Sequence, residues 1–155
     1  KFATTIKRTV AEATQLREKY YSVVPELPAY HKWIEDELNT KHELINPYGR
    51  RRIFTGRIDK DELYAGYAQL PQSTVGDTMN LGLLGLWLVR VDKPKLKFRA
   101  QIHDAGLFSL PASAVEFYTP YIKAHLETLR EIEINNEILV IPCDIGKPKE
   151  NWYGK

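Results

Sequence analysis

Apolar side chains recur every three or four positions along the first forty residues, which is the spacing of an amphipathic helix. In the first stretch these positions are Ile6, Val10, Ala13, Leu16 and Tyr20. Pro25 and Pro28 interrupt the pattern, and a second apolar run from Tyr30 to Leu38 resumes it. The pattern therefore predicts two helices in this part of the chain.

A longer helical pattern covers residues 61–91, and Pro71 is expected to interrupt it. Thr74 followed three residues later by Asp77 resembles a capping box, so we expect a new helix to begin there. One apolar stripe of this helix would face a core: Val75, Met79, Leu83 and Leu86. Gly82 weakens the helix intrinsically and would allow close packing against a sheet.

Residues 95–102 alternate between apolar and polar side chains, which is the period of a β-strand. The next four residues are typical of a turn, and residues 107–110 predict a returning strand. The segment is therefore expected to be a β-hairpin with a charged tip.

A further helix is expected to begin at a Ser113–Glu116 capping box and to be kinked or restarted at Pro120. Residues 138–145 predict a last strand. Hairpin-linked strands with helices stacked on one side indicate the α+β class.

The bulk composition narrows the class of protein only a little. At 155 residues, with 43% hydrophobic and 27% charged side chains, the chain fits one globular domain. No apolar stretch approaches the roughly 18 residues that span a bilayer, so no membrane partner is expected. Cys143 is the only cysteine, which excludes a disulfide framework and a cysteine-based zinc cage and favours a cytoplasmic location.

The net charge of +2 is too small to argue nucleic-acid binding by itself, so local clusters matter more. The densest is Arg50-Arg51-Arg52, which follows a turn signal at residues 46–49. The sequence also starts at Lys1 and its single methionine is Met79, which favours a fragment, a processed product or half of a split protein.

Asp104, at the tip of the predicted hairpin, is the strongest candidate for chemistry. An aspartate in a turn can simply bond its own backbone. It can equally be a ligand of a hard cation, since Mg²⁺ binds through one or two carboxylates plus substrate phosphates. In that case the neighbouring His103 could contact a phosphate. Spacing alone leaves both readings open.

The surroundings of Asp104 resemble motifs of family A DNA polymerases, the family of DNA polymerase I. The segment Gln101-Ile102-His103-Asp104 is similar to the strand and His-Asp-Glu turn of that family. The segment from Gln72 to Leu81 is similar to the family's Gln-Gly/Ser-x-x-x-Asp-x-Met/Ile-Lys-Leu helix start.

Three further segments follow the same order along the chain. Residues 48–52 are similar to a Gly-Arg-Arg-Arg segment that precedes the palm, and residues 19–30 resemble helices of the fingers. Gly146 with Asn151-Trp152 is similar to the polymerase terminus. Each segment is weakly specific alone, and together they cover nearly the whole chain.

The resemblance implies the C-terminal part of a polymerase, and its divergence favours a phage type. Residues 1–45 would be a helical segment from the fingers, and residues 46–155 would be the C-terminal half of the palm. The implied fold is an antiparallel palm-type sheet that carries the motif hairpin and packs against helices.

The same resemblance implies roles and partners. Asp104 would bind two catalytic Mg²⁺ ions together with an aspartate outside this chain, and His103 would contact the primer terminus. Gln72 would reach the minor-groove side of the duplex. The partners would be primer-template DNA and a deoxynucleoside triphosphate. Three arginines would contact the DNA backbone: Arg50, Arg51 and Arg52. The simpler alternatives are a solvated loop for the arginines and a helix-start hydrogen bond for Gln72.

The sequence departs from the family at the site itself. Ala105 stands where the family has glutamate, and the Asp-x-Ser-x-x-Glu motif that carries the partner aspartate does not occur. The triphosphate-binding finger helix is also missing. Three other aspartates have simpler explanations as caps or solvated residues: Asp59, Asp61 and Asp77.

We therefore expect that the chain has no polymerase activity alone and needs an N-terminal remainder, supplied covalently or as a separate subunit. The alternative is a non-catalytic DNA-binding or structural remnant of the fold. A metal-dependent phosphodiesterase of another kind would need more converging carboxylates than the sequence has.

Overall fold

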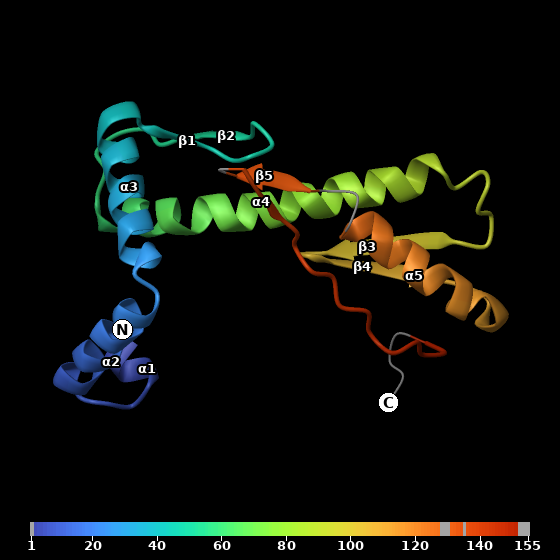
Figure 1. Ribbon diagram of the computed structural model, residues 1–155, viewed down its shortest axis with the longest axis horizontal. Coiled ribbons are helices and arrows are strands. Elements are labelled where there is room, and N and C mark those ends of the chain that lie inside the picture. Colours follow the sequence, from blue (N-terminus) through green and yellow to red (C-terminus); the bar gives the residue numbers. More distant parts are fainter. Residues whose placement is uncertain (1, 128–130, 135, 152–155) are drawn as a thin grey trace. The chain divides into compact units, whose positions relative to one another are not determined.

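The computed structural model describes residues 2–127, 131–134 and 136–151, and it contains helices and short antiparallel hairpins (Figure 1). The helices are α1 (Phe2–Thr5), α2 (Val10–Val23), α3 (Glu26–Lys41), α4 (Lys60–Leu88), the short 3₁₀ helix η1 (Ala112–Ala114) and α5 (Val115–Leu126). The strands are β1 (Glu43–Ile45), β2 (Arg51–Ile53), β3 (Lys97–Ile102), β4 (Ala105–Ser109), β5 (Ile132–Ile134) and β6 (Glu137–Leu139). Strands pair antiparallel as β1–β2, β3–β4 and β5–β6. The expected α+β class is confirmed.

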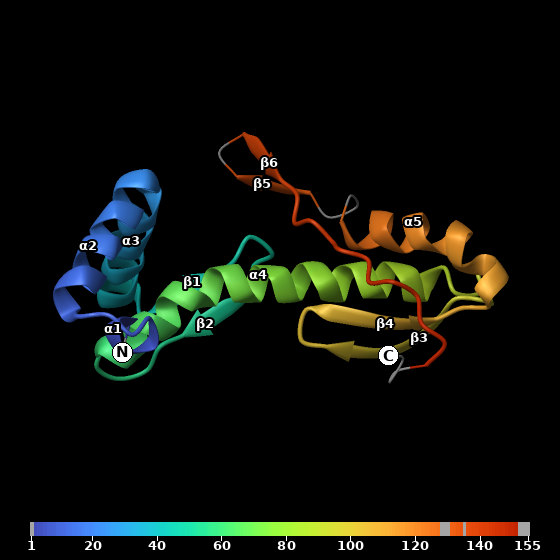
Figure 2. The same ribbon diagram turned by 90° about the horizontal axis from the view of Figure 1, so that it is seen from below.

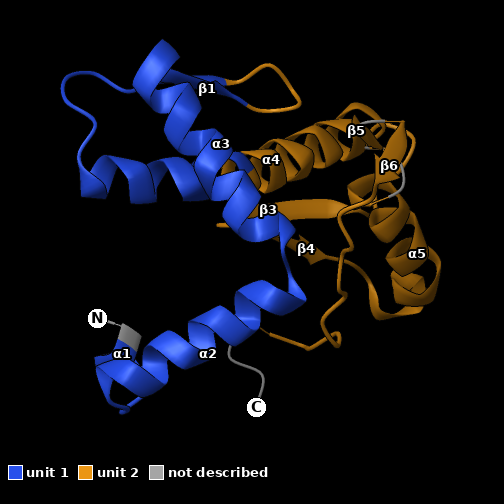
Figure 3. Ribbon diagram, turned by 60° about the vertical axis from the view of Figure 1, so that its left-hand side comes forward, with its two compact units in different colours: residues 1–45, 51–70 blue, residues 46–50, 71–155 orange. Residues whose placement is uncertain are grey.

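The chain forms two compact units, coloured separately in Figure 3. Unit 1 consists of residues 1–45 and 51–70, and unit 2 consists of residues 46–50 and 71–155. Each unit has its own hydrophobic core. None of the described helices is long and apolar enough to cross a membrane.

Unit 1 contains the two N-terminal helices that the apolar periodicity predicts. A capping box begins α2, since Thr9 Oγ1 accepts from the Glu12 amide and the Glu12 carboxylate accepts from the Thr9 amide. Pro28 does not delay α3, because a proline in the first turn removes no intrahelical hydrogen bond. The core of the unit is made by four buried residues: Ile34, Leu38, Leu44 and Phe54.

The apolar stripe of α2 is mostly exposed, whereas that of α3 contributes to the core of unit 1. Only Ala13 is buried, while Val10, Leu16 and Tyr20 are exposed. The periodicity therefore predicts the helix correctly, but it does not identify residues buried in unit 1.

Helix α4 runs without a break through Pro71, so the expected interruption is wrong. Proline has no N–H to donate to the carbonyl four residues earlier, which here belongs to Tyr67. The Tyr30 hydroxyl donates to that carbonyl instead, at 3.0 Å. Thr74 and Asp77 consequently lie inside the helix and do not form the expected capping box.

In unit 2 the second half of α4 lies between the β3–β4 hairpin and α5 (Figure 2). The core joins these three elements through buried side chains: Met79, Leu86, Leu96, Tyr118, Ile122 and Leu126. A Cβ at Gly82 would lie 2.8 Å from Leu126 Cδ2 and 3.0 Å from the His125 carbonyl oxygen. Gly82 therefore permits close packing against α5, and not against a sheet as expected.

The predicted β3–β4 hairpin is confirmed, with Ile102 opposite Ala105 next to the turn. A bulge between Phe98 and Ala100 shifts the register and breaks the simple alternation of faces. Phe98, at this bulge, is 43% exposed.

Three expectations for the C-terminal third are wrong: the Ser113–Glu116 capping box, a helix restarted at Pro120, and a last strand over residues 138–145. Helix α5 follows η1 with Ala114 as its N-cap and no side-chain cap, so Ser113 and Glu116 form no capping box, and Pro120 lies within the continuous helix. The last strand ends at Leu139, so most of residues 138–145 is not a strand. Trp152 lies outside the described residues.

Candidate functional site

The tip of the β3–β4 hairpin consists of His103 and Asp104, and both side chains are exposed. His103 has a φ of 54°, in the left-handed region that few residues other than glycine adopt. A positive φ at the first position of a two-residue turn matches the twist of the flanking strands. The tight turn thus presents the Asp104 carboxylate at a defined place on the hairpin.

A side-chain amide connects this tip to helix α4. Gln101 Nε2 donates to Asn80 Oδ1 at 3.0 Å and lies 3.4 Å from the His103 carbonyl oxygen. Since the core already packs α4 against the hairpin, this bond fixes the tip relative to the exposed face of the helix. Sequence reasoning assigned no role to Asn80, because its pairing with Gln101 depends on tertiary contact.

The hairpin tip offers one carboxylate as a metal ligand, that of Asp104. Within the described residues, no group of three histidine, cysteine, aspartate or glutamate side chains is placed to hold a metal ion. Asp104 is an exposed oxygen ligand of the type that Mg²⁺ prefers, so it fits as one ligand of such an ion. Asp144 and Glu150 line the same cavity as Asp104, but the three carboxylates do not form a group that could hold a metal ion.

Gln72 lies in unit 2, on the exposed surface of α4 in the turn that follows Pro71. Because α4 begins at Lys60, Gln72 is not at a helix start, and the helix-start hydrogen bond proposed as its alternative does not arise. Its amide is available to a ligand on this face of the helix.

Arg50 is bound to Asp77, a partner that the sequence did not indicate. Arg50 Nη2 lies 2.5 Å from Asp77 Oδ1, and Arg50 Nε donates to both carboxylate oxygens. Asn46 Nδ2 donates to Asp77 Oδ2 at 2.7 Å. The hydrogen bonds from Arg50, which outweigh the opposing effect of burial, lower the pKa of the Asp77 carboxyl.

This network fastens the turn at residues 46–50 to α4 and explains why the turn belongs to unit 2. The Tyr48 hydroxyl adds a hydrogen bond to Thr78 Oγ1 at 3.0 Å. The interpretation of Asp77 as a helix cap is wrong, because the residue is buried and acts as an acceptor for the turn. No local spacing could have revealed this pairing.

The other two arginines lie in unit 1 and have their own partners. Arg51 Nε lies 3.2 Å from the Glu43 carboxylate across the β1–β2 hairpin. Arg52 donates to Gln69 Oε1 at 3.0 Å, and its guanidinium lies 4.7 Å from the centre of the Phe54 ring. The arginine run is therefore anchored locally at each position, although all three side chains remain exposed.

The class of the fold is shown by its architecture: the chain has a DNA-polymerase-like α+β fold. It is similar to the POL domain of Pol1 from M. smegmatis, solved in complex with a DNA primer-template and dNTP, with a TM-score of 0.73 and 18% sequence identity. The match covers 89% of this chain and 26% of that chain, so this chain spans about a quarter of the length of its structural neighbour. No protein family and no curated protein matches the sequence.

The likeness confirms the polymerase fold implied by the sequence motifs. At this level of identity it concerns the fold alone. The expected C-terminal position, the phage type and the roles of individual residues stay predictions.

Proposed function

We propose that this chain is the C-terminal part of a family A DNA polymerase, which adds deoxynucleotides to a primer 3′ end. In this proposal residues 1–45 come from the fingers and residues 46–155 form the C-terminal half of the palm. The chain is inactive alone, because the second metal-binding aspartate comes from a segment outside it. The polymerase-like fold and the Asp104 turn together support this assignment.

The observation that carries the proposal is the geometry of the hairpin tip. Asp104 is exposed on a two-residue turn, and Gln101 ties that turn to Asn80 on α4. A carboxylate held in this way can bind a cation without first ordering its own loop. When bound, Mg²⁺ would favour the primer 3′-hydroxyl as nucleophile and stabilise charge on the phosphates.

The remaining residues would position the substrates. His103 would contact the primer-terminal backbone, and Gln72 would reach the minor-groove edge of the duplex near the new base pair. Arg51 and Arg52 would contact the DNA backbone. Arg50 could do the same through its exposed surface while it remains bound to Asp77.

The test is a chimera in which this chain replaces the matching quarter of the M. smegmatis polymerase domain. We expect primer extension by the chimera, and we expect Asp104→Ala to reduce its rate roughly 100-fold or more, since even residues that only support a metal ligand contribute 10–100-fold. The assay is extension of a labelled primer-template with dNTP and Mg²⁺.

Asp92→Ala is the matched control, because Asp92 is an exposed aspartate of the same unit that does not line the cavity of Asp104. This variant should extend primers at the rate of the parent chimera. Normal extension by Asp104→Ala would show that the catalytic assignment is wrong.

A non-catalytic remnant is the second candidate, and it is favoured by Ala105 in place of the family's glutamate and by the missing Asp-x-Ser-x-x-Glu motif. It predicts that the chain binds duplex DNA in a salt-dependent way with no effect of Mg²⁺. A folded but inactive chimera that binds primer-template equally well with and without Mg²⁺ would support this candidate over the first.

A further inference from the structure

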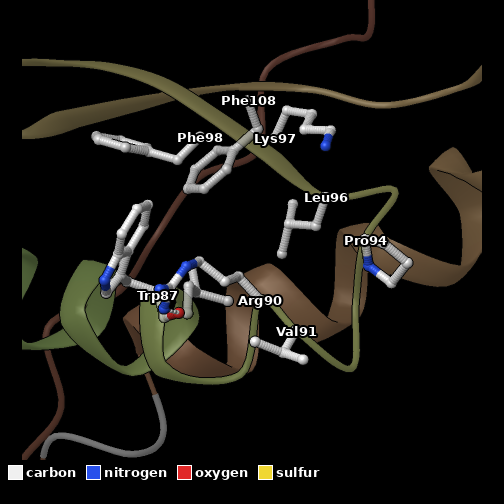
Figure 4. A pocket seen from close by; sticks show the side chains of 9 residues that line it. Trp87, Arg90, Val91, Pro94, Leu96, Lys97, Phe98 and Phe108 are labelled. Carbon is white, nitrogen blue, oxygen red and sulfur yellow. Dashed lines mark hydrogen bonds between the residues drawn. The ribbon is translucent and has the colours of Figure 1, made fainter.

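A recess lies at the end of the β3–β4 hairpin away from His103 and Asp104, where α4 leads into β3. It encloses about 320 Å³. Its lining is mainly apolar and aromatic, with two cations at the edge, as Figure 4 shows for Trp87, Arg90, Pro94, Leu96, Lys97, Phe98 and Phe108. Phe98 lies five residues before His103 along β3 and Phe108 lies four residues after Asp104 along β4, which corresponds to roughly 13–17 Å. The residues that line the recess have no part in the proposed polymerase reaction.

Aromatic rings remain accessible in this recess. Trp87 is 54% exposed and Phe98 is 43% exposed. The Phe98 and Phe108 ring centres lie 5.6 Å apart, and Figure 4 shows both rings and the Trp87 indole around the same opening. Exposed aromatic surface on a folded chain is costly, and a recess that gathers it is typical of a binding site.

Two cations, Arg90 and Lys97, line the recess. Of the neighbouring cations, Arg99 lines a different cavity and Lys93 lies against the Phe117 and Tyr121 rings of α5. Residues 90–99 contain five lysines and arginines and one aspartate. Within the part of the chain that the structure describes, none of these five cations forms an ion pair with a carboxylate. The charges of Arg90 and Lys97 are therefore available to an anionic ligand in the recess.

Arg90 is held against Trp87 by contacts within the chain. Its guanidinium lies 3.8 Å from the centre of the Trp87 ring, and Nη1 donates to the Trp87 carbonyl oxygen at 2.8 Å. These two contacts hold the guanidinium at the edge of the recess, so little side-chain freedom is lost when a phosphate binds.

We propose that this recess binds single-stranded DNA, with a base stacked in the aromatic opening and phosphates on the surrounding cations. Stacking platforms combined with a positive track are the usual means of binding single strands without sequence preference. Duplex DNA fits less well, because its bases already stack on each other. An acidic peptide would use the cations but has no planar ring for the exposed aromatic surface.

The experiment measures fluorescence anisotropy of a labelled 12-nucleotide oligothymidylate titrated with the whole chain at low salt. We expect Trp87→Ala and Phe98→Ala each to raise Kd about 10-fold, because one stacked base is lost. Tyr64→Ala is the matched control: Tyr64 is 55% exposed and has Lys60 5.8 Å from its ring centre, but it lies in unit 1. Its Kd should stay within about two-fold of wild type.

A second measurement keeps the test valid if Trp87→Ala does not fold. A Trp33→Phe, Trp152→Phe chain retains Trp87 as its only tryptophan. Oligothymidylate should quench this fluorescence, and a duplex of equal length should quench it less. The proposal is overturned if Trp87 emission does not respond, or if polyglutamate or anionic phosphatidylserine vesicles bind while oligothymidylate does not.

Binding of single-stranded DNA at the recess is separate from the proposed polymerase reaction, so each can be tested without the other. Asp104→Ala should leave oligothymidylate binding unchanged, because the two sites lie at opposite ends of the hairpin. Conversely, Trp87→Ala binding that equals wild type would remove the single-strand site and leave the Asp104 assignment untouched.

Discussion

Among the aspartates of unit 2, Asp77 and Asp104 have opposite surroundings. Asp77 is buried and accepts hydrogen bonds from Arg50 and Asn46, whereas Asp104 is exposed on a turn. A carboxylate already shared between a guanidinium and an amide is a poor ligand for a cation, because binding would require both bonds to break. Single-residue chemistry therefore points to Asp104 for ion binding and to Asp77 for stability.

The role of Asp77 gives a prediction about acid stability. Its folded-state pKa is lowered chiefly by Arg50, so its contribution is fully present above the unfolded pKa of about 3.9 and is lost as the pH falls through the folded pKa. We expect Asp77→Asn to lower the free energy of unfolding by about 1–2 kcal/mol at pH 7, given that Arg50 is half exposed. Urea unfolding at pH 7, 5, 4 and 3 should show this difference shrinking below about pH 4.

Glu43→Gln provides the control for this series. Glu43 forms a comparable ion pair with Arg51, but on the surface of the β1–β2 hairpin. Its loss should change the free energy of unfolding by less than about 1 kcal/mol at any of these pH values. An equal loss in the free energy of unfolding of both variants would mean that the buried Asp77 adds no more stability than a surface ion pair.

At the scale of secondary-structure elements, the continuity of α4 depends on a residue of another helix. Pro71 leaves the Tyr67 carbonyl without its helical donor, and the Tyr30 hydroxyl of α3 takes that place. Burial raises the pKa of the Tyr30 hydroxyl, which keeps its proton in place as a donor. A side chain of α3 thus supplies the hydrogen bond that the backbone of α4 cannot donate at Pro71.

This repair can be tested with a double-mutant cycle. Tyr30→Phe should lower the free energy of unfolding by about 1–2 kcal/mol, because the Tyr67 carbonyl loses its donor. In a Pro71→Ala chain the restored backbone N–H supplies the bond, so the same Tyr30→Phe change should cost markedly less. Chemical denaturation of the four chains measures the coupling, and a coupling of zero would contradict this account.

The pairing of Tyr30 with the Tyr67 carbonyl also shows what the sequence could and could not predict. The periodic helices and the β3–β4 hairpin depend on local spacing, so they were predictable, as was the place of His103 and Asp104 at the hairpin tip. The continuity of α4 and the binding of Arg50 to Asp77 depend on residues far apart in the chain. The Ser113 capping box failed for a different and local reason, since a 3₁₀ turn formed at residues 112–114 in place of the side-chain cap.

At the scale of the whole molecule, one helix contributes to two separate cores. Gly66 of α4 lies against Ile34 and Leu38 in unit 1, and Gly82 lies against Leu126 in unit 2. A Cβ at Gly66 would approach Leu38 Cδ1 to 2.6 Å, whereas one at Gly82 would also meet backbone atoms of α5. Side-chain tips can move aside more easily than backbone, so the two sites differ in tolerance.

We therefore expect alanine at Gly66 and alanine at Gly82 to destabilise different units of the chain. Gly66→Ala should speed amide hydrogen exchange mainly in α3 and β1, and Gly82→Ala mainly in α5, with the larger destabilisation of about 1–3 kcal/mol at Gly82. Hydrogen exchange followed by mass spectrometry of peptides resolves the two regions.

Gly76→Ala is the internal control for these chains. Nothing lies within 4 Å of a Cβ at this position, so only helix propensity should change, with a gain of about 0.5–1 kcal/mol. Equal acceleration of exchange in both units by Gly66→Ala or Gly82→Ala would mean that the two cores unfold as one.

The hydrogen bond from the Tyr30 hydroxyl to the Tyr67 carbonyl has a consequence for the evolution of the sequence. It replaces the helical hydrogen bond that Pro71 cannot donate. A proline at that position is harmful unless the donor is already present, so the order of the two substitutions is constrained: tyrosine first, proline second. Related chains are expected to keep the pair together or to lack the proline. A lineage that carries Pro71 with phenylalanine at position 30 would have to supply the missing proton from elsewhere.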